Sequence, residues 1–253
     1  MIFETHAHYE GQKYEEDRGV LLCSFPEKGI GHVLNISFDV NSAKKSISLA
    51  EEYSFFSAAV GIHPHYAKDV EENYIEQLEA LSKHEKVVAI GEIGLDFHYD
   101  YSPRDVQRKR FHEQLELVRK IGLPVIIHNR EADAEVFDIL KDARVHGIMH
   151  CFSGDVSLAK KYIDLGYYIG IGGIVTYKNA PILKEVVKEI PLEYLVVETD
   201  APYLAPVPHR GKRCDSTMLS HIVSEIANLK EISIEEVEEK TWNNACKIFG
   251  LNL

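Results

Sequence analysis

The sequence predicts a single (β/α)8 barrel over residues 1–253, and three observations support this prediction. A length of 253 residues is typical of one such barrel. Eight short apolar runs alternate with longer segments of helical period, as parallel strands joined by crossover helices require. Five of the runs end in a side chain that is able to bind a divalent metal, and parallel barrels present catalytic groups at the carboxyl ends of their strands.

The expected strands are short runs rich in Val and Ile. They cover residues 2–6, 31–38, 56–62, 87–91, 124–128, 146–150, 167–171 and 195–199. The clearest helices are expected at 70–83 and at 103–121, where Pro103 suits a first helical turn. The last segment, 233–249, is acidic and then apolar, which predicts a terminal helix packed on the outside. No linker or low-complexity stretch divides the chain, so we expect one domain.

Composition narrows the class of protein. Apolar residues make up 45% of the chain and charged residues 27%, as in an ordinary globular domain. We find neither a signal-peptide pattern nor an apolar run of transmembrane length, and therefore expect no membrane association. The four cysteines form no C-x-x-C pair, which favours reduced thiols. We expect a cytoplasmic monomer.

The net charge of −12 argues against broad, nonspecific coating of nucleic acid, because such binding depends on a basic surface. It leaves room for a nucleic-acid substrate, since bound divalent cations and a few arginines create a local positive site.

The first expected strand leads into His6-Ala7-His8. Alternate side chains on a strand share a face, so the two imidazoles point the same way, about 6.6 Å apart along the chain. An isolated H-x-H motif is as often two buried core histidines as a metal site. The four further strand-end ligands favour a metal site that includes His6 and His8.

Glu92 lies in Gly91-Glu92-Ile93-Gly94-Leu95-Asp96. The flanking glycines permit a sharp turn at the strand end and the close approach of a ligand. A glutamate has two oxygens and is able to bridge two cations about 3.5–4 Å apart. The apolar residues before Glu92 argue against an exposed loop carboxylate. We expect Asp96 to support a ligand histidine by a hydrogen bond.

His128 and His150 end the fifth and sixth expected strands. His146 and His150 would share a metal on a helix, but on a strand four residues span about 13 Å. His150 is therefore the candidate ligand, and His146 is expected to be structural. The candidate ligands then divide between two cations, with His6, His8 and Asp200 on one and His128 and His150 on the other.

Asp200 follows the last expected strand, two residues after Glu198. An aspartate at this place is able to bind metal and to take a proton from water whose pKa a metal has lowered. We expect Asp200 and Glu92 to be the catalytic carboxylates. Glu198 is expected to support the site rather than to take part in the reaction.

Local positive charge is expected near the same rim. Arg130 follows His128 by two residues, and the segment His209-Arg210-Gly211-Lys212-Arg213 is basic. Arginine holds phosphate oxygens in a planar fork. A short basic run is otherwise a solvated loop, but its place beside a metal site favours substrate binding by Arg130, Arg210 and Arg213. His63 ends the third expected strand and is also expected to contact substrate.

Six motifs follow one another over nearly the whole chain. They are Glu4-Thr5-His6-Ala7-His8, Gly61-Ile62-His63-Pro64-His65, Gly91-Glu92-Ile93-Gly94-Leu95-Asp96, Pro124-Val125-Ile126-Ile127-His128, His150-Cys151-Phe152-Ser153-Gly154 and Glu198-Thr199-Asp200-Ala201-Pro202-Tyr203-Leu204. Together they resemble the TatD family of metal-dependent hydrolases.

The resemblance implies a TIM barrel of the amidohydrolase superfamily with one or two divalent cations (Mg, Mn or Zn). It also implies deoxyribonuclease activity, commonly of the 3′-to-5′ exonuclease type. Carried over by position, it assigns one cation to His6, His8, Glu92 and Asp200, and the other to Glu92, His128 and His150.

The chain departs from the family pattern at two places. Glu4 stands where the family usually has Asp, which adds one methylene under the expected metals. Cys214-Asp215-Ser216 replaces an acidic-proline pair. The second departure lies in the expected substrate loop and bears on substrate preference.

Three functions are therefore compared. The leading hypothesis is a two-metal phosphodiesterase acting on single-stranded DNA or DNA ends. The alternative keeps the metals and hydrolyses a carboxyl ester, an amide or aminoacyl-tRNA, because the same activated water attacks a carbonyl as readily as phosphorus. A noncatalytic binding or scaffold protein is the third, and the intact ligand set counts against it.

Overall fold

A computed structural model describes residues 1–253 as a nearly closed barrel of eight parallel strands. Neighbouring strands pair in chain order. Main-chain hydrogen bonds join the first and last strands, from Asp200 N to His6 O (3.0 Å) and from His8 N to Ala201 O (2.8 Å). The predicted fold class is confirmed. The strands are β1 Ile2–Ala7, β2 Ile30–Ile36, β3 Phe56–Val60, β4 Val87–Asp96, β5 Val125–Arg130, β6 Gly147–Met149, β7 Tyr167–Ile171 and β8 Leu195–Val197.

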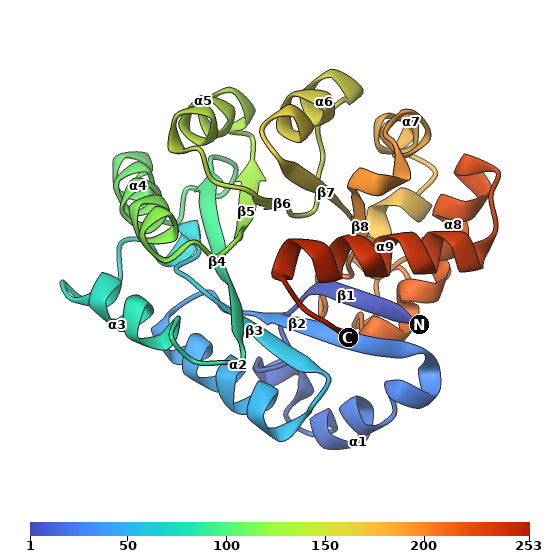
Figure 1. The fold of residues 1–253 in the computed structure, drawn as a ribbon, viewed down its shortest axis with the longest axis horizontal. Helices are drawn as coiled ribbons and strands as arrows, with labels where there is room; N and C mark the ends of the chain where they lie inside the picture. The colour runs from blue at the N-terminus through green and yellow to red at the C-terminus, as the bar shows by residue number, and fades with distance from the viewer.

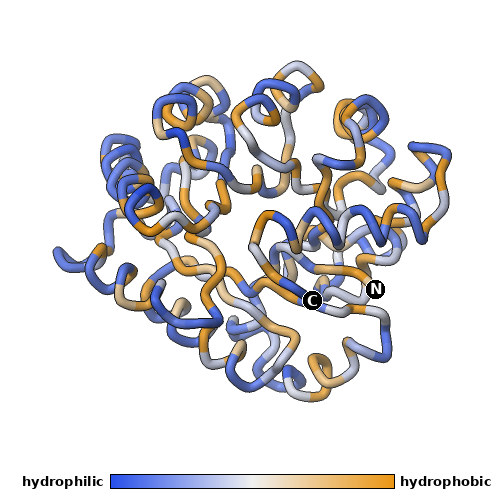
Figure 2. Tube along the Cα trace, viewed as in Figure 1, coloured by the Kyte–Doolittle hydropathy of each residue, from blue (hydrophilic) through white to orange (hydrophobic).

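Helices lie between the strands and form an outer ring (Figure 1). Hydrophilic colouring concentrates on their outer sides in Figure 2, as expected when each helix buries one apolar stripe against the sheet. None of the helices is both long and apolar enough to cross a membrane. The helices are α1 Arg18–Cys23, α2 Val40–Glu52, α3 Tyr74–Leu81, α4 Arg104–Ile121, α5 Asp133–Ala143, α6 Val156–Asp164, α7 Pro181–Glu189, α8 Leu219–Lys230 and α9 Ile234–Phe249.

The helix boundaries follow local sequence signals. Pro103 directly precedes α4, and Gly122 ends it with a φ of 75°, a backbone conformation that glycine adopts without strain. The side chain of Ser233 accepts a hydrogen bond from Glu236 N and so caps the start of α9. The expected helix at 70–83 is shorter in the structure, where α3 covers only Tyr74–Leu81.

The barrel interior is filled by apolar side chains from all eight strands, and α9 closes this interior core. Ile248 and Phe249 of α9 belong to the interior cluster, and the Phe249 ring stacks on Phe3 of β1 at 5.8 Å. Rather than packing on the outer ring as expected, α9 therefore covers the amino ends of the strands. The opposite end of the barrel is left for the polar site.

Strand β4 is longer than predicted. It continues past Glu92 and pairs with β5 as far as Asp96 opposite Arg130, with a register shift between Ile90 and Ile93. Gly94 has a φ of 151°, and a Cβ there would lie 1.9 Å from the carbonyl oxygen of His128. The strand therefore does not end at Glu92 as expected, because Gly94 has no side chain and lets β5 approach the continuing strand.

Candidate metal centre

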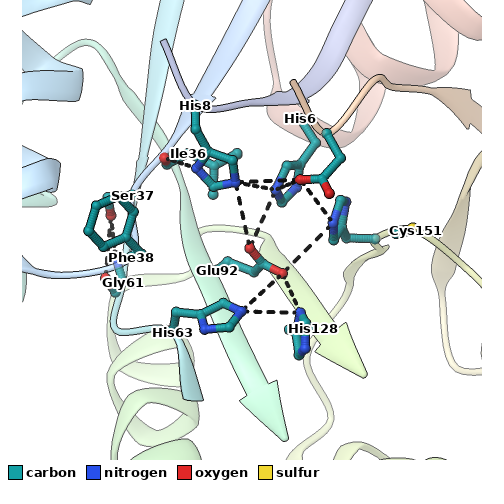
Figure 3. Close-up of polar contacts among 12 residues, drawn as sticks. His6, His8, Ile36, Ser37, Phe38, Gly61, His63, Glu92, His128 and Cys151 are labelled. Carbon is teal, nitrogen blue, oxygen red and sulfur yellow. Dashed lines mark hydrogen bonds and ion pairs between the residues drawn. The ribbon is translucent and has the colours of Figure 1, made fainter. Parts of the chain in front are cut away.

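Five of the six predicted metal ligands lie at the carboxyl ends of the strands around the sixth, Glu92. Figure 3 shows His6, His8 and His128 beside it. The two oxygens of Glu92 face different neighbours. Oε2 is 3.4 Å from His6 Nε2 and 4.0 Å from His8 Nε2. Oε1 is 2.7 Å from His128 Nδ1 and 3.8 Å from His150 Nε2. Glu92 thus lies between His6 and His8 on one side and His128 on the other, and His150 Nε2 lies 3.8 Å from both Glu92 Oε1 and Asp200 Oδ1.

The first histidine pair is held by β1 and its neighbours. His6 is completely buried, and its ring stacks on that of His150 with centroids 3.4 Å apart. His8 Nδ1 donates a hydrogen bond to the carbonyl of Ile36 at 2.8 Å. The proton of a neutral His8 ring is therefore on Nδ1, which leaves the lone pair of Nε2 directed at His6 and Glu92.

Asp200 completes this side of the site. Its Oδ1 lies 3.6 Å from His8 Nε2 and 3.8 Å from both His6 Nε2 and His150 Nε2. The side chain of Asp200 is 18% exposed, whereas that of Glu92 is 4% exposed. Asp200 is thus the carboxylate nearer to solvent, where a water molecule reaches it first.

The donor spacing fits a divalent cation. Two ligands that each lie about 2.0–2.2 Å from one cation are separated by roughly 3–3.5 Å at tetrahedral or octahedral angles. The gaps of 3.4 Å between His6 and Glu92 and 3.6 Å between His8 and Asp200 are of this order. Imidazole nitrogen and carboxylate oxygen suit Zn²⁺ and Mn²⁺. Three compact groups of donors are present: His6, His8 and Glu92; His6, His150 and Glu198; and His63, Glu92 and His128.

Glu92 is ionised in this setting. Burial by itself disfavours the carboxylate, but the imidazoles of His63, His150, His6 and His128 hold the pKa of Glu92 well below its usual range. A buried carboxylate of this kind binds a cation without first losing a proton.

Two carboxylates, Glu198 and Asp96, each contact the ring nitrogen of a ligand histidine that faces away from Glu92. Glu198 Oε1 lies 2.9 Å from His150 Nδ1 and also accepts the main-chain N–H of Cys151. Burial lowers the pKa of His150, but Glu198 and Glu92 outweigh it and raise that pKa to about 10. Gly170 makes room for Glu198, since a Cβ there would lie 2.6 Å from Oε2.

Asp96 stands behind His128 in the same way. Its Oδ2 lies 3.0 Å from His128 Nε2 and 2.8 Å from His65 Nε2, and its Oδ1 accepts the N–H of Tyr99. Burial opposes ionisation of Asp96, but the hydrogen bonds from His128 and His65 keep its pKa well below the usual range. Asp96 therefore fixes His128 with Nδ1 toward Glu92.

Comparison with known proteins agrees with this geometry. Residues 3–250 match the sequence profile of the family described as TatD related DNase. The chain belongs to the TatD family. It is a metal-dependent hydrolase of that family.

Relatives and solved structures extend over the whole chain. The uncharacterized metal-dependent hydrolase YabD of Bacillus subtilis is 42% identical over 255 residues, with both chains fully covered. YcfH of Escherichia coli, also an uncharacterized metal-dependent hydrolase, is 34% identical and is covered over 97% of its length, against 100% of this chain. The crystal structure of YjjV, a TatD homologue from Escherichia coli, superposes with a TM-score of 0.93 at 29% identity, covering 99% of this chain and 98% of YjjV.

The two departures from the TatD pattern touch each other. Buried Glu4 accepts hydrogen bonds from His6 N (3.2 Å), Thr199 N (2.8 Å), Thr199 Oγ1 (2.7 Å) and Ser216 Oγ (2.9 Å). Burial raises the pKa of Glu4 to about 8, although these hydrogen bonds oppose the rise. Glu4 thereby joins β1 to the segments that carry Asp200 and Ser216, a link that no local sequence signal predicts.

Two further histidines lie closer to the site than the sequence suggests. His63, predicted to contact substrate, has Nε2 3.3 Å from His128 Nδ1 and 3.8 Å from Glu92 Oε1. His65, beyond Pro64, reaches Asp96. The H-x-H pattern of His63 and His65 repeats that of His6 and His8, and is the signal that could have placed both at the site. Exposed His146 precedes β6 and lies apart from this group, as its spacing predicts.

The three predicted phosphate-binding arginines differ in their partners. Arg130 packs over the ring of Tyr99 at 4.8 Å, and Arg210 over Tyr177 at 4.4 Å; neither guanidinium has an ion-pair partner. Arg213 instead binds Asp17 and the carbonyl of Lys13. None of the three contacts a candidate metal ligand. Because only Arg213 has an ion-pair partner, Arg130 and Arg210 are the two with free guanidinium groups.

Proposed function

We propose that this TatD-family hydrolase is a phosphodiesterase that removes nucleotides from single-stranded DNA ends, as a 3′-to-5′ exonuclease does. The observation that carries the proposal is the position of Glu92, whose two oxygens face two separate groups of donors. Two cations held about 3.5–4 Å apart are a common arrangement in enzymes that cleave phosphodiesters. The description of the matching family supports a nucleic-acid substrate.

Specific residues would hold the cations. His6, His8 and Asp200 would hold one, His128 and His150 the other, and Glu92 would contact both. Divalent cations at such a site lower the pKa of water and neutralise charge on the phosphate. His63, which lies within 3.8 Å of Glu92, is proposed to contact substrate beside the second group.

Asp200 is the proposed proton acceptor. It is the most exposed carboxylate of the site, and its side chain accepts no hydrogen bond from the main chain. As the oxygen of water bonds to phosphorus, Asp200 takes the proton that water gives up, and the ester oxygen leaves as an alcohol after taking up a proton from solvent. Glu92 keeps the two halves of the site together, and Glu198 and Asp96 hold His150 and His128 in place.

Unpaired arginines supply the proposed phosphate contacts. Arg130 is the last residue of β5, two positions after His128, and Arg210 lies in the loop after β8. Both guanidinium groups are free to bind two oxygens of a phosphate through their planar fork of N–H donors. Arg213 reaches a phosphate only by leaving Asp17, so we rank its contribution below theirs.

One experiment tests the function. Purified protein is incubated with end-labelled single-stranded DNA and added Mg²⁺, Mn²⁺ or Zn²⁺, with Asp200→Asn as the matched control. We expect metal-dependent shortening of the DNA by the unchanged protein alone. Intact DNA together with hydrolysis of a carboxyl ester, amide or aminoacyl-tRNA would favour the alternative substrate class. A protein that binds no metal and hydrolyses nothing would be a scaffold.

The four cysteines are free, which agrees with a reducing compartment. We infer a cytoplasmic monomer, which subcellular fractionation and light scattering of the purified protein would test.

A further inference from the structure

The exposed tyrosines are unevenly distributed over the molecule. Five tyrosines are exposed, and four of them follow the carboxyl ends of strands, beside the metal centre: Tyr66, Tyr99, Tyr101 and Tyr203. Only Tyr194, which precedes β8, lies toward the other end of the barrel. Large aromatic rings gathered at one mouth of a protein are a sign of a binding surface. The four rings are named the tyrosine rim below.

The pair Tyr99 and Tyr101 is the best-defined part of the rim. Their rings stack with centroids 5.2 Å apart and an interplanar angle of 15°. Tyr101 is 55% exposed, and Arg130 stands over Tyr99. The Tyr101 ring lies 4.8 Å from the ring of His65. The stacked pair thus presents a flat surface to solvent, and the His65 ring lies between it and the ring of His128, 6.1 Å from the latter.

The backbone holds this pair in place. Asp96, which supports His128, also accepts the N–H of Tyr99 through its other oxygen. Asp96 thus links the main chain at Tyr99 to the candidate ligand His128.

Aromatic rings continue around the mouth. Tyr66 stacks on Phe38 at 4.9 Å. Phe38 lies 6.4 Å from the ring of His8, and both are labelled in Figure 3. Tyr203 donates its N–H to the carbonyl of Asp200, and Lys13 stands over its ring at 4.3 Å. Aromatic rings, two of them accompanied by cations, therefore flank the site on both sides of Glu92.

We propose that the tyrosine rim binds the unpaired bases of the substrate by stacking, with Tyr101 as the main contact. This inference rests on the proposed function and specifies its substrate as a single strand that carries bases. The chain has a net charge of −12 and so cannot hold DNA by a broad basic surface. Stacking on aromatic rings, with a few local cations, is the recognition mode left to an acidic protein.

Binding of a phosphorothioate-linked oligothymidylate, which resists hydrolysis, tests the proposal on the full chain with Mg²⁺ present. Fluorescence anisotropy gives Kd for a strand labelled at one end. Removal of one aromatic ring that stacks on a base weakens binding about 5- to 150-fold, which is the change we expect for Tyr101→Ala. Tyr101→Phe keeps the ring and should retain the affinity. Tyr194→Ala removes an exposed tyrosine outside the rim and should leave Kd unchanged.

An abasic strand of the same length separates bases from backbone. We expect it to bind weakly and to be insensitive to Tyr101→Ala. With few cations at the rim, log Kd should change with log salt by a slope of about 1 to 2 in magnitude, since each phosphate contact to a single strand contributes about 0.7.

Equal binding of the abasic and thymidine strands, an equal loss in Tyr194→Ala, or no binding by the unchanged protein would overturn the inference. Cleavage assays on unmodified DNA keep the two proposals apart. Base-dependent binding without cleavage would contradict the proposed function and leave the stacking proposal supported. Cleavage that is as fast on abasic strands as on normal ones would sink the stacking proposal alone.

Discussion

Nδ1 of His150 lies 2.9 Å from Oε1 of Glu198, while Nε2 of the same ring is 3.8 Å from both Glu92 and Asp200. The two residues stand 48 positions apart in the chain and are joined only by the pairing of β6, β7 and β8. One nitrogen is held by Glu198, so the other is directed into the candidate metal centre. A ligand histidine is commonly fixed through its second nitrogen in this way.

Replacing Glu198 by Gln should weaken metal binding without removing a ligand. Loss of the carboxylate behind His150 lowers the basicity of the ring and frees its orientation, which typically costs 10- to 100-fold in metal affinity. Titration of the apoprotein with Zn²⁺ or Mn²⁺ measures the effect. Glu185→Gln, on the exposed face of α7, is the matched control, and equal affinity in the two variants would remove this role.

Asp200→Asn should leave the fold intact and remove most turnover. Asparagine has nearly the same shape, but it neither accepts a proton nor carries the charge that faces His8. A missing general base typically lowers the rate by about 10²- to 10⁴-fold. The measurement is kcat on the substrate identified above, together with a thermal melt. A variant that melts normally and keeps its full rate would exclude Asp200 as the base.

Gly94→Ala should destabilise the barrel where β4 passes β5. The added Cβ would lie 1.9 Å from the carbonyl oxygen of His128, so β5 must move and His128 with it. We expect a loss of about 2–4 kcal/mol in the free energy of unfolding, measured by urea denaturation.

Gly11→Ala is the control for this change, because the nearest atom to its added Cβ is His8 O at 3.5 Å. Gly11 also has an ordinary φ of −71°. Similar losses in both variants would mean that contact with β5 is not the cause.

Glu4 and Ser216 should be energetically coupled. Glu4→Asp shortens the side chain by one methylene and draws the carboxyl away from Ser216 Oγ, now 2.9 Å away. Ser216→Ala removes the same hydrogen bond from the other side. A double-mutant cycle on the free energy of unfolding should give a coupling energy of about 0.5–3 kcal/mol, whereas strict additivity would show that the contact contributes nothing.

His32 should make the protein less stable in mild acid. It is buried on β2 with Nε2 2.9 Å from Ser57 Oγ. Burial, with a smaller effect of Lys86, lowers the pKa of His32 to about 4. The unfolded chain takes up a proton near pH 6.5, but the folded chain does so only near pH 4. Stability from the neutral ring is therefore full above about pH 6.5 and falls by up to about 3 kcal/mol as the pH drops to about 4.

Urea denaturation near pH 7.5 and near pH 4.5 measures this loss. His32→Gln keeps a donor for Ser57 but does not titrate, and should lose less stability between the two pH values. An unchanged pH dependence in this variant would assign the acid sensitivity to other groups.

The elements of the fold were largely predictable because their signals are local. Each signal involves only a few neighbouring residues. Examples are the runs of Val and Ile in the strands, Pro103 and Gly122 at the ends of α4, and Ser233 before α9. The end of β4 was not predictable in this way. Gly94 signals a turn when considered alone, and only the carbonyl of His128 on the next strand shows that the glycine serves strand pairing.

The sequence by itself determined the barrel and the set of strand-end side chains, because hydrophobic period and residue type are properties of short segments. Tertiary structure decided which partners these side chains meet. It placed Glu198 behind His150, joined Glu4 to Ser216, paired Arg213 with Asp17 and left Tyr101 open beside the site. The three pairs are 48, 212 and 196 positions apart in the chain, so they depend on strand register and loop course, which no local pattern encodes.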